Sequence, residues 1–159
     1  MKASVIFAIA IALPVAASAA DMTMPKANMQ ATRSADVKWG PAPPMLPAGA
    51  QMAVMSGNPA EKGFVSVRAS VPAGYTVPPH THPTDEHVTV LSGSMAFGMG
   101  DKMDPAMETT VASGGYFVAQ ALMHHYARAT EASVIQIDME GPFDITYINP
   151  ADDPRNKGK

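Results

Sequence analysis

The stretch PPHTHPTDEHVTVLSG, from Pro78 to Gly93, holds three of the five histidines in this chain of 159 residues. His80 and His82 are two residues apart, and Glu86 follows four residues after His82. Alternate side chains of an extended strand point to the same face, so these three even-numbered residues would share a face from which His87 points away. Two imidazoles and a carboxylate on one face are a suitable ligand set for a divalent metal. The stretch therefore predicts a metal site.

Glycines frame this stretch at fixed distances. Gly74 lies six residues before His80, and Gly93 lies seven residues after Glu86, which gives the pattern Gly-x5-His-x-His-x3-Glu-x6-Gly. This pattern resembles the first conserved motif of the cupin superfamily at every fixed position. In cupins two antiparallel sheets form a small barrel, and the two histidines and the glutamate of the motif bind a metal inside it. The resemblance implies that His80, His82 and Glu86 are metal ligands.

The resemblance also implies a fourth ligand, a histidine from a second motif later in the chain. In cupins that motif usually reads Gly-x5-Pro-x-Gly-x2-His-x3-Asn, and this chain offers the degenerate match GGYFVAQALMHHYARA. Counted from Gly114, His125 falls on the ligand position. Counting from Gly115 would put Tyr126 there, which is a poorer ligand, and the neighbouring His124 is the rival. We expect His125 because it keeps the spacing.

From Gln51 onward the chain consists of short β-type runs separated by turn residues. Phe64–Val71 alternates, with Val65, Val67 and Ala69 on one side, and no helical apolar period persists for ten residues. Such a pattern predicts an all-β fold, and the resemblance specifies an antiparallel double-stranded β-helix, the cupin or jelly-roll barrel. The other expected strands are Glu86–Leu91, Met95–Met99, Thr109–Val111, Tyr116–Ala119, His125–Ala129, Val134–Met139 and Ile145–Ile148.

One strand leaves the character of the barrel interior open. Along Val134–Met139, one face carries Gln136 and Asp138, and the other carries Ile135 and Ile137. An inward polar face would hydrogen-bond a substrate, whereas an inward apolar face would make the pocket apolar. The candidate polar groups for the pocket wall are Arg68, Gln120, Gln136 and Tyr126.

The N-terminus resembles an export signal. Lys2 precedes an apolar run over Val5–Val15, and Ala17-Ser18-Ala19 has the small-x-small form of a signal-peptidase site. The run is shorter than the ~20 residues that a membrane-spanning helix needs. We expect residues 1–19 to be a cleaved signal peptide and the mature protein to be periplasmic or secreted.

Beyond this signal, we expect a flexible linker at 20–37, a cupin barrel domain at 38–150 and a polar C-terminal tail at 151–159. Met22, Met24 and Met29 in the linker could bind Cu(I) through their thioethers, although a plain linker is the simpler interpretation. Prolines at 41, 43, 44 and 47 indicate an extended segment lying on the domain.

Composition excludes several functions. The formal charge is −3, or −4 without Lys2, with no basic patch, so we expect no nucleic-acid partner. The chain has no cysteine, which excludes disulfides and thiolate ligands, and no second apolar run of membrane-span length, so we expect no membrane contact after signal cleavage. We see no Ser-His-Asp arrangement and no glycine-rich phosphate loop. Sequence assigns neither a catalytic residue nor an organic cofactor site.

The resemblance covers Lys38 to Arg155 and is specific for the fold and the metal site rather than for a reaction. Cupins include dioxygenases, isomerases, epimerases, decarboxylases and proteins that bind without turnover. We expect an exported protein that binds one divalent transition metal, which could be Fe, Mn, Zn, Ni or Cu. It would act on a small molecule as a dioxygenase-like oxidoreductase or an isomerase, or bind or sense a ligand or metal without catalysis. Cupins often dimerise, so a homodimer is a further option.

Overall fold

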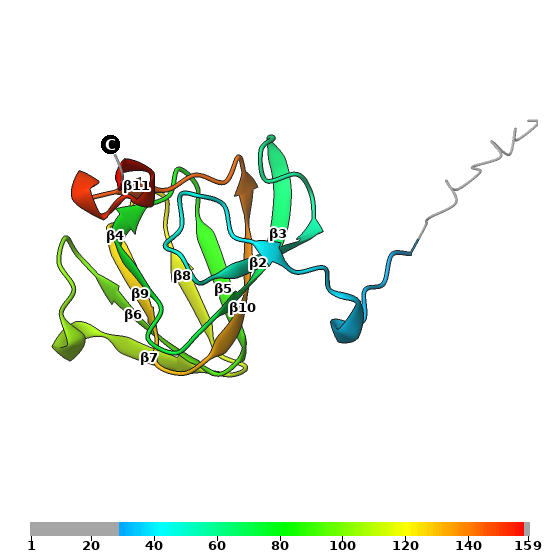
Figure 1. Ribbon diagram of the computed structural model, residues 1–159, viewed down its shortest axis with the longest axis horizontal. Helices are drawn as coiled ribbons and strands as arrows, with labels where there is room; N and C mark the ends of the chain where they lie inside the picture. The colour runs from blue at the N-terminus through cyan, green and yellow to red at the C-terminus, as the bar shows by residue number, and fades with distance from the viewer. Residues whose placement is uncertain (1–28, 158–159) are drawn as a thin grey trace, which may run out of the picture. The chain divides into compact units, whose positions relative to one another are not determined.

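The computed structural model describes residues 29–157, and in this part of the chain the strands form two antiparallel sheets (Figure 1). The six-stranded sheet, in spatial order, contains β1 (Gly40–Pro41), β2 (Gln51–Ser56), β3 (Gly63–Val71), β10 (Ser133–Gly141), β5 (Glu86–Ser92) and β8 (Tyr116–Ala119). The five-stranded sheet contains β11 (Thr146–Tyr147), β4 (Thr76–Thr81), β9 (His125–Ala129), β6 (Ser94–Met99) and β7 (Thr109–Ala112).

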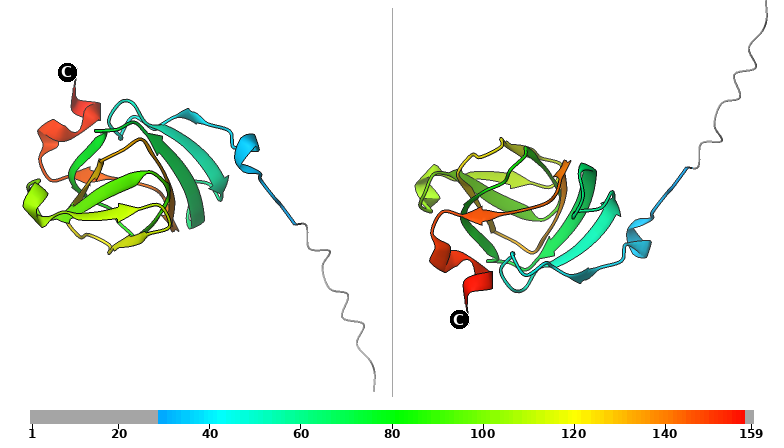
Figure 2. Two further views of the ribbon diagram at one scale, coloured as in Figure 1. Left: turned by 90° about the horizontal axis from the view of Figure 1, so that it is seen from below. Right: turned by 90° about the horizontal axis from the view of Figure 1, so that it is seen from above.

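The sheets curl into a barrel around one core (Figure 2). Val65, Val67 and Ala69 are buried inside, as the alternation along β3 predicts, while Phe64 on the opposite face is 60% exposed. On β10 the apolar face is the inward one, because Ile135 and Ile137 are buried. The question that the sequence left open therefore has an answer: β10 presents an apolar face to the barrel interior.

All of the expected strands are present: β8 and β9 have the expected bounds, and the bounds of the others differ by one or two residues. Sequence did not delimit β4, because this strand contains Pro78 and Pro79, which lack the N–H group that a sheet ladder needs. The pairing of β4 with β9 shifts by one residue at this point, between the pairs Val77–Ala127 and His80–His125. The two prolines therefore lie in a β-bulge.

Short 3-10 helices complete the described chain. They are η1 (Ser34–Asp36), η2 (Pro105–Met107), η3 (Pro150–Asp152) and η4 (Pro154–Asn156), the last two within or beside the expected polar tail. None of the helices in residues 29–157 is long and apolar enough to span a membrane.

The signal peptide expected at residues 1–19 lies outside the described residues, as do linker residues 20–28 with Met22 and Met24. Met29, which is described, is 92% exposed.

Candidate metal centre

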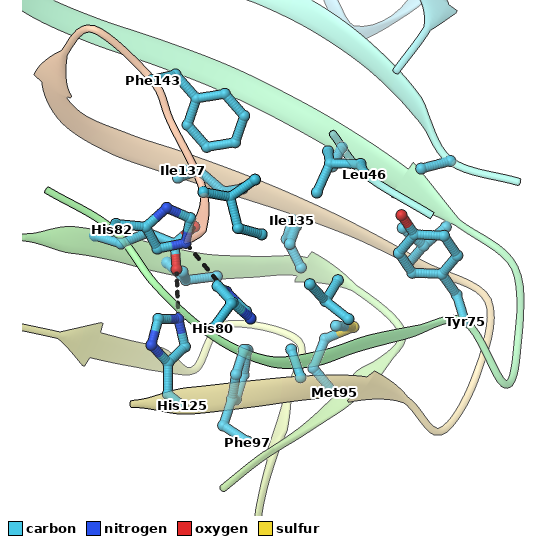
Figure 3. Close-up of a pocket in the computed structure, with 18 residues that line it drawn as sticks. Leu46, Tyr75, His80, His82, Met95, Phe97, His125, Ile135, Ile137 and Phe143 are labelled. Carbon is cyan, nitrogen blue, oxygen red and sulfur yellow. Dashed lines mark hydrogen bonds and ion pairs between the residues drawn. The ribbon is translucent and has the colours of Figure 1, made fainter. Parts of the chain in front are cut away.

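Three histidines meet in the barrel interior: His80 near the end of β4, His82 just after it and His125 at the start of β9 (Figure 3). The carboxylate of Glu86, at the start of β5, lies beside His82 and His125. All four are buried. The bulge at Pro78–Pro79 makes this arrangement possible. Val77 lines the interior, and without an extra residue in the strand His80 would take the opposite face.

The route of the chain differs from the single extended face expected from sequence. β4 belongs to the five-stranded sheet and β5 to the six-stranded sheet, so the chain crosses between the sheets after His82. His82 and Glu86 nevertheless meet, because both sheets turn their inner faces toward the same space.

The distances in this cluster are those of groups that could share one ion. One ligand atom from each of His80, His82 and His125 lies within 4.8 Å of the others. The Glu86 carboxylate lies 3.6 Å from His82 Nε2 and 3.5 Å from His125 Nε2. The Nε2 atoms of His80 and His82 are 3.2 Å apart.

Backbone carbonyls fix the tautomers of the three rings. The Nδ1 atoms of His80, His82 and His125 donate to the carbonyls of Pro78, Asp144 and Met123 at 2.7, 2.7 and 2.9 Å respectively. A carbonyl oxygen only accepts, so each Nδ1 carries the proton, and each Nε2 of a neutral ring presents a lone pair. Anchoring of the other ring nitrogen in this way is the usual support of a metal-binding histidine.

Three Nε2 lone pairs and a carboxylate thus converge with no donor among them. His125 Nε2 is buried without a hydrogen-bond partner among the described atoms. A buried polar atom without a partner costs free energy, and a cation at the meeting point would satisfy all four groups. The donor set fits a divalent transition metal, since imidazole and carboxylate ligands suit Fe, Zn, Ni, Cu and Mn.

The cluster opens onto a cavity of about 60 Å³. The polar groups of its lining are the four clustered side chains and the hydroxyl of Tyr75, which donates to the carbonyl of Pro47 at 2.9 Å. The rest of the lining is apolar: Leu46, Ala50, Ala69, Val71, Val77, Val88, Met95, Phe97, Ala127, Ile135, Ile137, Phe143 and Ile145.

Comparison with known proteins places the chain in a family. Residues 14–146 match the family model described as a domain of unknown function, DUF4437. The chain belongs to the DUF4437 family. A search of curated proteins found no significant match.

Solved structures share the fold of this DUF4437 protein. The polyketide cyclase RemF from Streptomyces resistomycificus has a TM-score of 0.64 at 17% identity, covering 80% of this chain and 90% of that one. A protein assigned as an acetylacetone dioxygenase from Methylibium petroleiphilum PM1 has a TM-score of 0.61 at 21% identity, covering 84% and 90%. An RmlC-like cupin from Ralstonia eutropha JMP134 has a TM-score of 0.59 at 18% identity, covering 79% and 76%. The resemblance to cupins is confirmed, and the fold is the cupin barrel.

Burial and neighbouring side chains shift the pKa values of His80 and Glu86 in the DUF4437 centre. Burial, assisted by electrostatic interaction with His125 and His82, lowers the pKa of His80 to about 3, so this ring is neutral at physiological pH. Burial alone would raise the pKa of the Glu86 carboxyl, but the neighbouring His82 and His125 outweigh it and lower that pKa to about 2. The centre therefore offers a carboxylate and a neutral imidazole, as metal binding requires.

The other two histidines of the DUF4437 protein lie outside the cluster. His124 is 46% exposed at its side chain, and its Nδ1 lies 2.5 Å from a carboxylate oxygen of Asp101. His87 points away from the interior, as its odd position predicts, and its ring bonds to the hydroxyl of Tyr116. Of the two adjacent candidates, the structure brings His125 to the cluster and leaves His124 outside.

The prediction of polar side chains in the pocket wall was wrong. Arg68 donates to Gln136 at 3.2 Å, and Tyr126 bonds to the backbone of Asp104. None of Arg68, Gln120, Gln136 and Tyr126 lines the cavity. The lining residues that sequence reasoning missed include Leu46. The one indication in the sequence was that Leu46 belongs to the proline-rich segment expected to lie on the domain.

Proposed function

We propose that this DUF4437 protein binds one divalent transition metal through His80, His82, Glu86 and His125. The observation that carries the proposal is the convergence of three imidazole Nε2 atoms and a carboxylate with no hydrogen donor among them. Each ring is already held by a carbonyl, so the three imidazoles are oriented to receive an ion.

We further propose that the protein is a metal-dependent enzyme of the dioxygenase-like type, acting on a small and largely apolar molecule. Four protein ligands would leave two positions of an octahedral ion free, and a bound metal would supply Lewis acidity or, as iron, chemistry with O₂. The apolar walls would exclude water and pack against the body of a substrate whose oxygen atoms face the metal.

The lining favours oxidation over isomerisation. An isomerase needs a group that takes and returns a proton within reach of the substrate. Apart from the proposed ligands, the polar side chain that lines this cavity is Tyr75, whose hydroxyl donates a hydrogen bond to the carbonyl of Pro47. The name of the similar protein from Methylibium petroleiphilum PM1 is consistent with this choice.

The size of the cavity favours one alternative, a module that binds or senses a metal or small ligand without turnover. A volume of about 60 Å³ is well below the roughly 300–1,000 Å³ that is typical of ligand pockets. Such a site would hold its metal in a closed shell with no exchangeable position.

We also propose export to the periplasm or the exterior, on the strength of Lys2, the apolar run and Ala17-Ser18-Ala19. This location, and a homodimeric state, are independent of the metal proposal.

Elemental analysis and nitric oxide binding test the metal and its open positions. Untagged protein should carry close to one equivalent of a transition metal, and His80→Ala/His82→Ala should carry none. After loading with Fe(II) under argon, nitric oxide, which stands in for O₂, should give an iron–nitrosyl EPR signal. The loaded protein should then consume O₂ with acetylacetone as the first trial substrate. Bound metal without a nitrosyl signal would favour the binding module, and absence of any metal would refute the proposal.

A further inference from the structure

A proline-rich segment covers one side of the metal cavity. This segment, Pro41–Ala50, runs from the last residue of β1 to the residue before β2, and we call it the strap. Its Leu46 and Ala50 side chains line the cavity. In Figure 3, Leu46 and Tyr75 lie on the side of the cavity away from His82 and His125.

Two buried tyrosines donate hydrogen bonds to the backbone of the strap. The hydroxyl of Tyr147 in β11 donates to the carbonyl of Met45 at 2.8 Å, and the hydroxyl of Tyr75 donates to the carbonyl of Pro47 at 2.9 Å. These two acceptors flank Leu46 on both sides. The turn bonds of the strap itself, from Leu46 N–H to Pro43 and from Ala42 N–H to Ala50, are internal.

The strap is thin at Leu46. A second pocket, of about 400 Å³, lies against the strap, and its lining contains strap residues and Pro154 of η4. Leu46 and Ala50 line this pocket as well as the metal cavity. A single layer of side chains therefore separates the two spaces.

We propose that the strap is the entrance to the metal cavity and that Leu46 sets the size of the ligand that reaches the metal. This inference rests on the proposed function, because it names the residue that selects ligands for that site. Release of two hydrogen bonds lifts the strap, and the Leu46 side chain then leaves the cavity. The ligand class is a small molecule with a metal-chelating oxygen pair and an apolar body.

The opposite wall is the competing route. Phe97 lines the metal cavity and also an outer groove of about 890 Å³, where it stacks on Phe117 with ring centroids 4.3 Å apart. Phe97 lies on β6, where it pairs with Thr109 of β7 on one side and with Ala127 of β9 on the other. Opening this wall breaks a sheet ladder. The strap is held by two hydrogen bonds and by the packing of Met45, Leu46 and Ala50 against the core, and segments with fewer hydrogen bonds open at lower free energy.

Histidine acylation in the metal-free protein tests the entrance. Diethyl pyrocarbonate acylates neutral imidazole, and tandem mass spectrometry resolves each of the five histidines. His80, His82 and His125 should react slowly in the wild type. In Tyr75→Phe/Tyr147→Phe their rate should rise by about thirtyfold, since each of the two lost bonds contributes ~1 kcal/mol.

His87 and His124, which lie outside the barrel interior, serve as internal controls and should react equally in all variants. Unchanged rates at the three interior histidines in the tyrosine double variant would overturn the proposal. Faster acylation of the interior histidines in Phe117→Ala, but not in the tyrosine double variant, would also overturn it, because that result would place the entrance at the opposite wall.

Size selection is tested in protein loaded with Co(II), whose absorption spectrum reports ligand binding. Leu46→Ala should tighten benzohydroxamate by about tenfold or more while changing acetohydroxamate little, because both probes share one chelating group and differ in bulk. Leu46→Phe should weaken benzohydroxamate, and the matched control Leu91→Ala, outside the cavity, should change neither. Equal effects of Leu46→Ala and Leu91→Ala would refute the role of Leu46. Failure to bind Co(II) would refute the proposed function, while the acylation rates would still decide the strap.

Discussion

His80 and His82 face each other through their Nε2 atoms at 3.2 Å, and both rings donate their Nδ1 hydrogens to backbone carbonyls. When the rings are neutral, no hydrogen lies between these two nitrogens. The metal-free protein therefore holds a local repulsion that a cation would remove, so the proposed metal would add directly to folding stability.

Replacement of Glu86 by glutamine should have opposite effects on the stability of the metal-free protein and on its affinity for metal. The amide of Glu86→Gln can donate to a histidine Nε2, so at about pH 8 the metal-free variant should be more stable than wild type by roughly 1 kcal/mol. Loss of the carboxylate should at the same time weaken metal binding. Thermal melts with chelator and with added metal measure both. The exposed Glu140→Gln is the control and should change neither, and a metal-free Glu86→Gln that melts below wild type would contradict this reading of the tautomers.

Substitution of the two adjacent histidines should give unequal results. His125→Ala should lose most of the bound metal, because its Nε2 points at Glu86 inside the barrel. His124→Ala should keep it, since that side chain bonds to Asp101 outside. Metal content after dialysis, measured by elemental analysis, provides the ranking, and the reverse ranking would remove His125 from the site.

Acid should destabilise the metal-free protein. The pKa of His80 is lowered from 6.5 to about 3 in the fold, so the unfolded chain binds more protons as pH falls through this window. Stability from His80 is complete above pH 6.5 and is lost toward pH 3. Glu86, lowered from 4.5 to about 2, acts in the same direction at lower pH.

Urea unfolding in the presence of chelator should therefore show a lower midpoint at pH 5 than at pH 7. His80→Gln should reduce this difference, because it removes the proton-binding ring. Equal midpoints for wild-type protein at the two pH values would show that His80 is not held neutral.

The two motif glycines should differ in their tolerance of a side chain. Gly93 has φ +77°, and a Cβ there would overlap the Ala132 carbonyl and the Ser133 hydroxyl. Gly74 has φ +78° with nothing within 4 Å of such a Cβ. Gly93→Ala should cost about 2 kcal/mol or more, and Gly74→Ala about 1 kcal/mol from backbone strain alone. Denaturant titrations compare them, and equal costs would exclude the overlap as the cause.

Export can be tested at the N-terminus. Full-length precursor expressed in a bacterium should give a mature protein beginning at Ala20 or Asp21, and Ala19→Arg should block the cleavage. N-terminal sequencing of wild-type protein that finds intact Met1 would remove the proposal of a signal peptide.

Sequence predicted the parts of this protein that depend on local pattern. Alternation placed Val65 and Val67 in the core, and motif spacing selected His125, the histidine that the structure brings beside Glu86. Both follow from strand geometry, which fixes the face of a side chain by its position along the chain.

Features that depend on contacts between distant segments could not be predicted. The Pro78–Pro79 bulge is visible only from the pairing of β4 with β9. The inward face of β10 is decided by the second sheet, since either face of that strand could have been inside. Leu46 is held beside the cavity by hydrogen bonds from two tyrosines to its neighbours in the chain. These tyrosines lie about 30 and 100 residues away in sequence, and no local pattern predicts a contact over such a separation.

The way the strap is tied has a consequence for how such a pocket could diversify. Tyr75 and Tyr147 bind the backbone carbonyls of Pro47 and Met45, so the bonds that hold Leu46 in place do not depend on which side chain stands at position 46. A substitution there changes the space beside the proposed metal site without changing its four side chains or the two tyrosines. Selectivity for ligands can in this way drift by single mutations while the chemistry of the centre and the architecture of the barrel stay constant.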